Sequence, residues 1–71
     1  MAITRKNLVS YIIAYEEGAL GWKEVLRLFA FLIRTGLVWH LQGHYGRTAS
    51  DLIKAGIISE SGRINWKALS D

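Results

Sequence analysis

The sequence predicts an all-α fold, a small compact bundle of three to four helices around a central apolar helix at about residues 22–35. Apolar residues recur at three- and four-residue spacing in several segments, which places them on one face of an α-helix. Glycines follow these segments, and glycine commonly closes a helix. The 71 residues leave room for a single domain, 1–71, whose 51% hydrophobic content is large for its size.

The first helix is expected at about residues 5–17. Thr4 is a good N-cap, and Gly18 is expected to end the helix. The apolar residues that share one face of this helix are Leu8, Tyr11, Ile12 and Tyr15.

The central helix is expected to begin at Trp22, with Gly21 as its N-cap and Glu24 in its first turn. From residue 25 to 33 only Arg27 is polar, so the helix is predicted to be buried on nearly all sides. Two interpretations stay open: the helix is simply the core, or it is core on one side and partner interface on the other. The second arises because few other elements are available to cover Leu26, Phe29, Phe31, Leu32 and Ile33.

Gly36 is expected to interrupt the apolar run, and residues 37–41 suffice for one or two further helical turns. Gly43 and Gly46 are expected to end that piece. The turn between them would consist of His44 and Tyr45.

A third helix is expected at about residues 49–55, with Thr48 as its cap, Asp51 in a capping-box position and Gly56 at its end. Because it is short, it needs tertiary packing to be stable.

Residues 57–64 have the outline of a minimal β-hairpin with a glycine turn. Asn65 is expected to cap a final turn at 66–69, in which the Trp66 indole closes one end of the core.

Composition and hydropathy exclude several functions. The absence of cysteine excludes disulfides and thiolate metal sites and agrees with a cytoplasmic location. Arg27 and Arg34 interrupt the apolar run 25–41, so no membrane span is expected, and the N-terminus lacks the pattern of a signal peptide.

Nine Lys and Arg against six Asp and Glu give a net charge of +3. Basic residues indicate nucleic-acid binding only where they share one face. We expect them on an ordinary solvated surface instead, because they are scattered along the chain; eight of the nine are Lys6, Lys23, Arg27, Arg34, Arg47, Lys54, Arg63 and Lys67.

No metal, cofactor or catalytic site is expected. His40 and His44 have the four-residue spacing of metal ligands on a helix, but Gly43 interrupts that helix and no further ligand has a telling spacing. His40, Ser50 and Asp51 are triad residue types, yet so short a chain offers little room for a pocket of ~300 Å³ with positioned groups around it. The protein is therefore predicted not to be an enzyme.

The segment 43–48 superficially resembles a phosphate loop, because two glycines and a basic residue precede a helix N-terminus. It lacks the Walker spacing and a preceding strand. We therefore expect a structural corner between two helices, formed by Gln42, Gly43, Gly46 and Thr48. Arg47 is predicted to donate to carbonyls of the segment ending near Gln42, so that Arg47→Ala would cost roughly 1–3 kcal/mol. The alternative is a corner that binds an anion or a partner.

The same region resembles a group of short uncharacterised proteins encoded by tailed bacteriophages. The likeness covers about residues 15–58, and Gly21 and the more basic N-terminus depart from it. It implies a phage protein in the host cell cytoplasm but no particular activity. The residues that carry it are Leu28-Phe29, Leu32-Ile33, Thr35-Gly36, Trp39, Leu41-Gln42-Gly43, Tyr45-Gly46-Arg47-Thr48-Ala49, Leu52-Ile53 and Ala55-Gly56.

These observations lead to the hypothesis of a non-enzymatic, phage-type accessory protein that binds another protein, either a host or defence component or a second copy of itself. The candidate partner-binding residues are Phe31, Trp39, His44, Tyr45 and Arg47. The alternative is a helix-turn-helix-like nucleic-acid-binding protein, with helices 22–35 and 49–55 and a reduced wing at 57–64. Its turn is longer than the usual three to four residues, which weakens this alternative.

Overall fold

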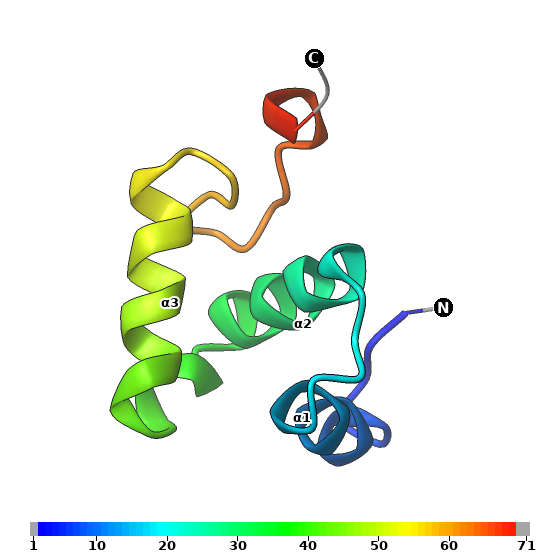
Figure 1. The fold of residues 1–71 in the computed structure, drawn as a ribbon. Coiled ribbons are helices and arrows are strands. Elements are labelled where there is room, and N and C mark those ends of the chain that lie inside the picture. The colour runs from blue at the N-terminus through cyan, green and yellow to red at the C-terminus, as the bar shows by residue number, and fades with distance from the viewer. Residues whose placement is uncertain (1, 70–71) are drawn as a thin grey trace.

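The computed structural model describes residues 2–69 and confirms the prediction of a small all-α bundle. Helix α2 runs across the middle, α1 lies below it in the view of Figure 1, and α3 stands beside the C-terminal end of α2. The 3-10 helix η1 packs against both α2 and α3, and so joins them. The elements are α1 (Leu8–Glu16), α2 (Trp22–Thr35), η1 (Leu37–His40), α3 (Gly43–Lys54) and η2 (Trp66–Leu69).

Helix α2 has the predicted bounds and forms the core. Gly21 caps it with extended backbone, and Gly36 follows it in the left-handed region, with φ of 79°. All five apolar side chains that were hardest to cover are buried, whereas Trp22, at the start of α2, remains 58% exposed. Three of the buried residues in the same core cluster lie outside the three α-helices: Ile3 before α1, Val38 in η1 and Ile58 in the segment after α3.

Helix α1 begins at Leu8, three residues later than predicted, and Asn7 rather than Thr4 occupies the N-cap position. The Asn7 side chain explains why α1 begins later than predicted. Its Oδ1 accepts a hydrogen bond from the Thr4 N–H at 2.7 Å, and its Nδ2 donates to the Ala2 carbonyl at 3.2 Å. Asn and Asp side chains compete with the helix for backbone groups in this way, so the residues between Thr4 and Asn7 form a turn.

Helix α3 begins at Gly43, six residues earlier than predicted, so the expected turn at His44 and Tyr45 and the cap at Thr48 are wrong. Neither Gly43 nor Gly46 has positive φ. A helical glycine costs about 1 kcal/mol relative to alanine, and burial of Tyr45 in the core offsets that cost. The Trp39 indole lies against this part of α3, since its nearest ring atom is 3.8 Å from where a Cβ of Gly46 would stand, an ordinary van der Waals distance.

The segment after α3 is the predicted minimal hairpin, reduced to a single antiparallel bridge between Ile58 and Ile64. Its turn is closed by the Ser59 N–H, which donates to the Arg63 carbonyl at 2.8 Å, and by the Gly62 N–H, which donates to the Ser59 carbonyl at 2.9 Å. The turn brings Gly62 into close contact with the backbone of α2. The hairpin is therefore held against the central helix.

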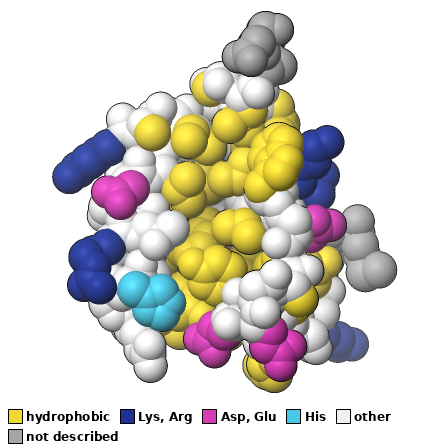
Figure 2. All heavy atoms as spheres, viewed as in Figure 1, with side chains coloured by type: hydrophobic (Ala, Val, Ile, Leu, Met, Phe, Trp, Pro, Cys, Tyr) yellow, Lys and Arg dark blue, Asp and Glu magenta, His cyan; other side chains and the backbone are white. Residues whose placement is uncertain are grey.

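Hydrophobic side chains form a band on the face of the molecule seen in Figure 1, over the region between α2 and α3 (Figure 2). Lysine, arginine, aspartate and glutamate side chains lie along the edges of this band. None of the helices within residues 2–69 has the length and apolar content needed to cross a membrane.

Candidate functional site

The structure divides the five predicted partner-binding residues into buried and accessible ones. Tyr45 is 2% exposed and Phe31 7% exposed, which corrects the prediction that these two rings face a partner. Trp39 is 53% exposed and Arg47 is also exposed, whereas His44 is half-buried with its ring centroid 4.2 Å from that of Tyr45. Of these five residues, Trp39 and Arg47 are the exposed ones.

Tyr45 joins α3 to the other two helices. Its ring centroid lies 5.7 Å from that of Tyr15 and 6.0 Å from that of Phe29. Its hydroxyl donates a hydrogen bond to Oε2 of Glu16, at the end of α1, at 2.7 Å. Burial, followed by this hydrogen bond and the charge of Glu16, raises the pKa of the Tyr45 hydroxyl well above its ordinary range. Tyr45 is thus a structural residue of the corner.

Trp39 stands at the centre of an accessible surface on the outer side of α3. Its indole borders two hollows, with volumes of about 390 and 520 Å³. Ser50 and Lys54 line both hollows as well. We call this the Trp39 surface, and its remaining lining residues are Gly43, Gly46, Arg47, Asp51, Ile53 and Glu60. It combines a large apolar ring with charges of both signs.

Arg47 does not perform the structural role predicted for it. Its side chain is exposed and runs back along α3, so that Nη1 lies 3.1 Å from where a Cβ of Gly43 would stand. Within residues 2–69, the hydrogen bonds around Gln42 are made by the backbone, where the Tyr45 N–H donates to the Gln42 carbonyl at 2.9 Å, and none involves the Arg47 guanidinium. Thr48 lies inside α3 and does not cap it.

We therefore expect Arg47→Ala to change the free energy of unfolding by less than about 0.5 kcal/mol, as for other exposed residues without specific contacts. Urea unfolding of the wild type and the variant measures this change. A loss of roughly 1–3 kcal/mol would instead show that the guanidinium satisfies buried acceptors.

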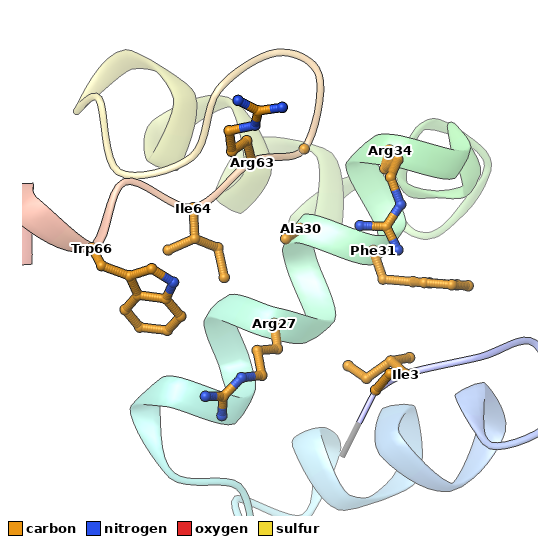
Figure 3. Close-up of a pocket in the computed structure, with 10 residues that line it drawn as sticks. Ile3, Arg27, Ala30, Phe31, Arg34, Arg63, Ile64 and Trp66 are labelled. Carbon is orange, nitrogen blue, oxygen red and sulfur yellow. The ribbon is translucent and has the colours of Figure 1, made fainter.

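A second accessible site lies between α2 and the hairpin (Figure 3). Arg27, Phe31 and Arg34 follow one another at four- and three-residue spacing and share one face of α2. The hairpin adds Arg63, and η2 adds Trp66. Together these residues border a groove with a volume of about 660 Å³, which we call the arginine groove. Its other lining residues are Ala2, Ile3, Ala30, Gly62 and Ile64.

The arginine groove is cationic, and two of its guanidinium groups lie over aromatic rings. Arg27 lies over the Trp66 ring, with Cζ 5.5 Å from the centroid, and Arg34 lies over the Phe31 ring at 5.4 Å. No carboxylate lines the groove within the described residues, and none of the three arginines has a carboxylate partner there. Trp66 does not close the core as predicted, because it remains 42% exposed at the edge of this groove.

The sequence analysis missed the arginine groove because the basic residues are scattered along the chain. One signal was present: Arg27 and Arg34 interrupt an otherwise apolar helix at a seven-residue spacing, which places them on the same face. Nothing local connects them to Arg63. The hairpin that carries Arg63 reaches α2 only in the folded chain.

His40 ends η1, whereas His44 lies in the first turn of α3, so the two histidines do not share a continuous helix. In the described part of the chain, no three His, Asp or Glu side chains gather closely enough to hold a metal ion.

Comparisons with curated proteins and with solved structures found no match. One protein family matches residues 3–70, which is nearly the whole chain. The chain therefore belongs to the family described as a domain of unknown function, DUF7417.

Proposed function

We propose that this protein is a non-enzymatic accessory protein that acts by binding another protein, and that the Trp39 surface makes the central contact. The observation that carries the proposal is the half-exposed Trp39 indole between two hollows. Tryptophan is enriched among the interface residues that dominate binding energy, and such residues are typically surrounded by polar neighbours that exclude water. Lys54, Asp51 and Glu60 are positioned to serve as such a rim.

The other two tryptophans add to this support. Trp22 and Trp66 are also substantially exposed, so the fold leaves every indole of the chain accessible although it buries Leu26, Leu28, Phe29, Ala30, Phe31, Leu32 and Ile33 of α2. The hydrophobic band with charged edges in Figure 2 adds further accessible apolar surface. Large exposed apolar patches rimmed by polar residues mark interaction sites.

The nucleic-acid alternative finds less support. Residues 36–42 separate α2 from α3, a connection longer than the turn of a helix-turn-helix motif. The accessible side of α3 carries Asp51 beside Arg47 and Lys54, so it is not uniformly basic. A recognition helix that approaches phosphates needs a basic surface.

The resemblance of the segment from Thr35 to Ala49 to bacteriophage proteins supports a component of the bacterial host cell, encountered in its cytoplasm, as the partner. The alternative partner for this surface is a second copy of the chain. Light scattering distinguishes such a dimer from a monomer that binds a host component.

We expect Trp39→Ala to reduce binding of the partner by roughly tenfold or more, because loss of a dominant interface residue costs about 2 kcal/mol or more. The measurement is capture from host lysate on immobilised protein, followed by affinity measurement with the purified partner. Trp22→Ala is the matched control, because it removes an equally exposed indole that lines neither the hollows nor the arginine groove.

Thermal melts show whether each variant is folded, and Lys54→Glu provides a second test that reverses a charge at the rim without removing apolar contact. The proposal fails if the wild type is monomeric and captures nothing, or if Trp39→Ala and Lys54→Glu retain the partner as well as Trp22→Ala does. If light scattering shows a dimer that Trp39→Ala dissociates, the partner is a second copy.

A further inference from the structure

We infer that the arginine groove binds a short acidic and apolar segment of a partner protein, an inference that rests on the proposed function of protein binding. The groove combines two kinds of surface (Figure 3). Ile3, Ala30 and Ile64 supply apolar contact, while Arg27 and Arg34 place guanidinium groups beside it; Arg63 also lines the groove, but its side chain points away from α2. A ligand that complements both surfaces carries carboxylates for the arginines and apolar side chains for the apolar residues.

The charge of the groove selects the carboxylates. Within residues 2–69, the Arg27 and Arg34 guanidinium groups have no internal carboxylate partner, so their donors remain available to a ligand in the groove. Arginine presents its N–H groups in a planar fork that matches a carboxylate with two parallel hydrogen bonds. Several acidic side chains in one short segment would therefore be recognised together.

Two of the three arginines are already held in place. Arg27 lies over the Trp66 ring and Arg34 over the Phe31 ring. A side chain that is ordered before binding loses less conformational entropy when the ligand arrives. Both stacked arginines lie on one face of α2. The helix therefore fixes the distance between them before a ligand binds.

The aromatic rings favour a peptide over single-stranded nucleic acid. Nucleic-acid bases bind such proteins by stacking on free aromatic faces. Phe31 is almost fully buried and Arg34 covers its ring, while Arg27 lies over the Trp66 ring. No other basic residue of the described chain lines the groove, so its positive charge comes from three arginines.

The volume of the groove limits the size of the occupant. About 660 Å³ falls within the roughly 300–1,000 Å³ of small-molecule sites. A short segment of chain therefore fills it, whereas the rest of a partner would contact other surfaces such as the Trp39 surface.

The test uses the full chain labelled with ¹⁵N and a short acetylated peptide of repeated Glu-Glu-Leu units. The indole N–H of Trp66 reports on the arginine groove, and those of Trp22 and Trp39 are internal controls because neither residue lines it. We expect the peptide to shift the Trp66 signal and to leave the other two unchanged. A peptide of repeated Gln-Gln-Leu units, which keeps the shape and removes the charge, is expected to bind roughly tenfold more weakly.

The variant Arg27→Gln/Arg34→Gln is expected to weaken binding of the Glu-Glu-Leu peptide by roughly tenfold or more, since it removes two charged donor groups. Arg5→Gln/Lys6→Gln is the matched control, because it lowers the net charge equally at exposed positions outside both the groove and the Trp39 surface. Arg34→Gln alone keeps the test decisive if the double variant is unstable, since Arg34 is exposed.

Equal weakening by the groove and control variants would overturn the inference, as would equal binding of the two peptides or no shift of Trp66. Tighter, groove-dependent binding of a single-stranded oligonucleotide would overturn it in favour of nucleic acid. The experiments distinguish failure of this inference from failure of the proposed function. Partner capture that depends on Trp39 but survives Arg27→Gln/Arg34→Gln would refute the role of the groove in that complex and leave the proposed function intact.

Discussion

Gly62→Ala is expected to lower the free energy of unfolding by roughly 2–4 kcal/mol, because two costs combine. Gly62 has φ of 85°, which costs a residue with a Cβ about 1–2 kcal/mol. The added Cβ would also stand 2.6 Å from the Ala30 carbonyl oxygen and 2.8 Å from the Arg34 backbone nitrogen. Both neighbours belong to the backbone of α2, so they cannot move aside as a flexible side chain would.

This loss is large for a chain of this length, whose total stability is expected to be roughly 4–11 kcal/mol. Urea unfolding measures it. Gly56→Ala is the matched control, since Gly56 also has positive φ, 75°, but nothing lies within 4 Å of its Cβ position. The control should cost only the conformational part, about 1–2 kcal/mol. Equal losses in the two variants would show that contact between the hairpin and α2 contributes nothing to the effect.

Tyr45→Ala is expected to destabilise the protein by roughly 3–5 kcal/mol, the range for removing a buried aromatic ring. The ring is almost fully buried against Tyr15 and Phe29, so its removal leaves a cavity where α1, α2 and α3 meet. Tyr45→Phe keeps the ring and removes only the hydrogen bond to Glu16, so it should cost about 1 kcal/mol. Thermal and urea unfolding of both variants separate the packing from the hydrogen bond.

The Tyr45 hydroxyl also makes the free energy of unfolding depend on pH in the alkaline range. In the unfolded chain, Tyr45 loses its proton near its ordinary pKa of about 10. In the folded protein, burial and the hydrogen bond to Glu16 raise this pKa, so the proton is retained to higher pH. The contribution of Tyr45 is therefore complete below pH ~10 and falls as the pH rises above that value. Tyr45→Phe has no such group, so its stability relative to wild type should rise above pH ~10. A constant difference across that range would contradict this explanation.

Local signals were enough to predict much of the fold. The bounds of α2 and the end of α1 before Gly18 follow from apolar periodicity and from a glycine placed where the chain turns left-handed. The hairpin and the last helical turn at 66–69 were also predicted. Each of these features depends on residues that are close together in the sequence, which is why pattern and composition reveal them.

The misplaced start of α3 shows where local signals fail. Gly43 and Gly46 suggested a turn because glycine usually marks one, yet both are helical here. Burial of Tyr45 outweighs the low helix propensity of glycine. Arg47 was misassigned as a consequence, because a residue inside a continuous helix has no open corner to bridge.

By itself, the sequence determined an all-α domain with a central apolar helix at 22–35, because periodicity and helix ends are local properties. Tertiary structure alone decided two further features. It covered α2 with side chains from connecting segments, and it brought Arg63 beside Arg27 and Arg34 to form the arginine groove. Both depend on contacts between residues far apart in the chain, and the free energy of such contacts is realised only when the whole core packs.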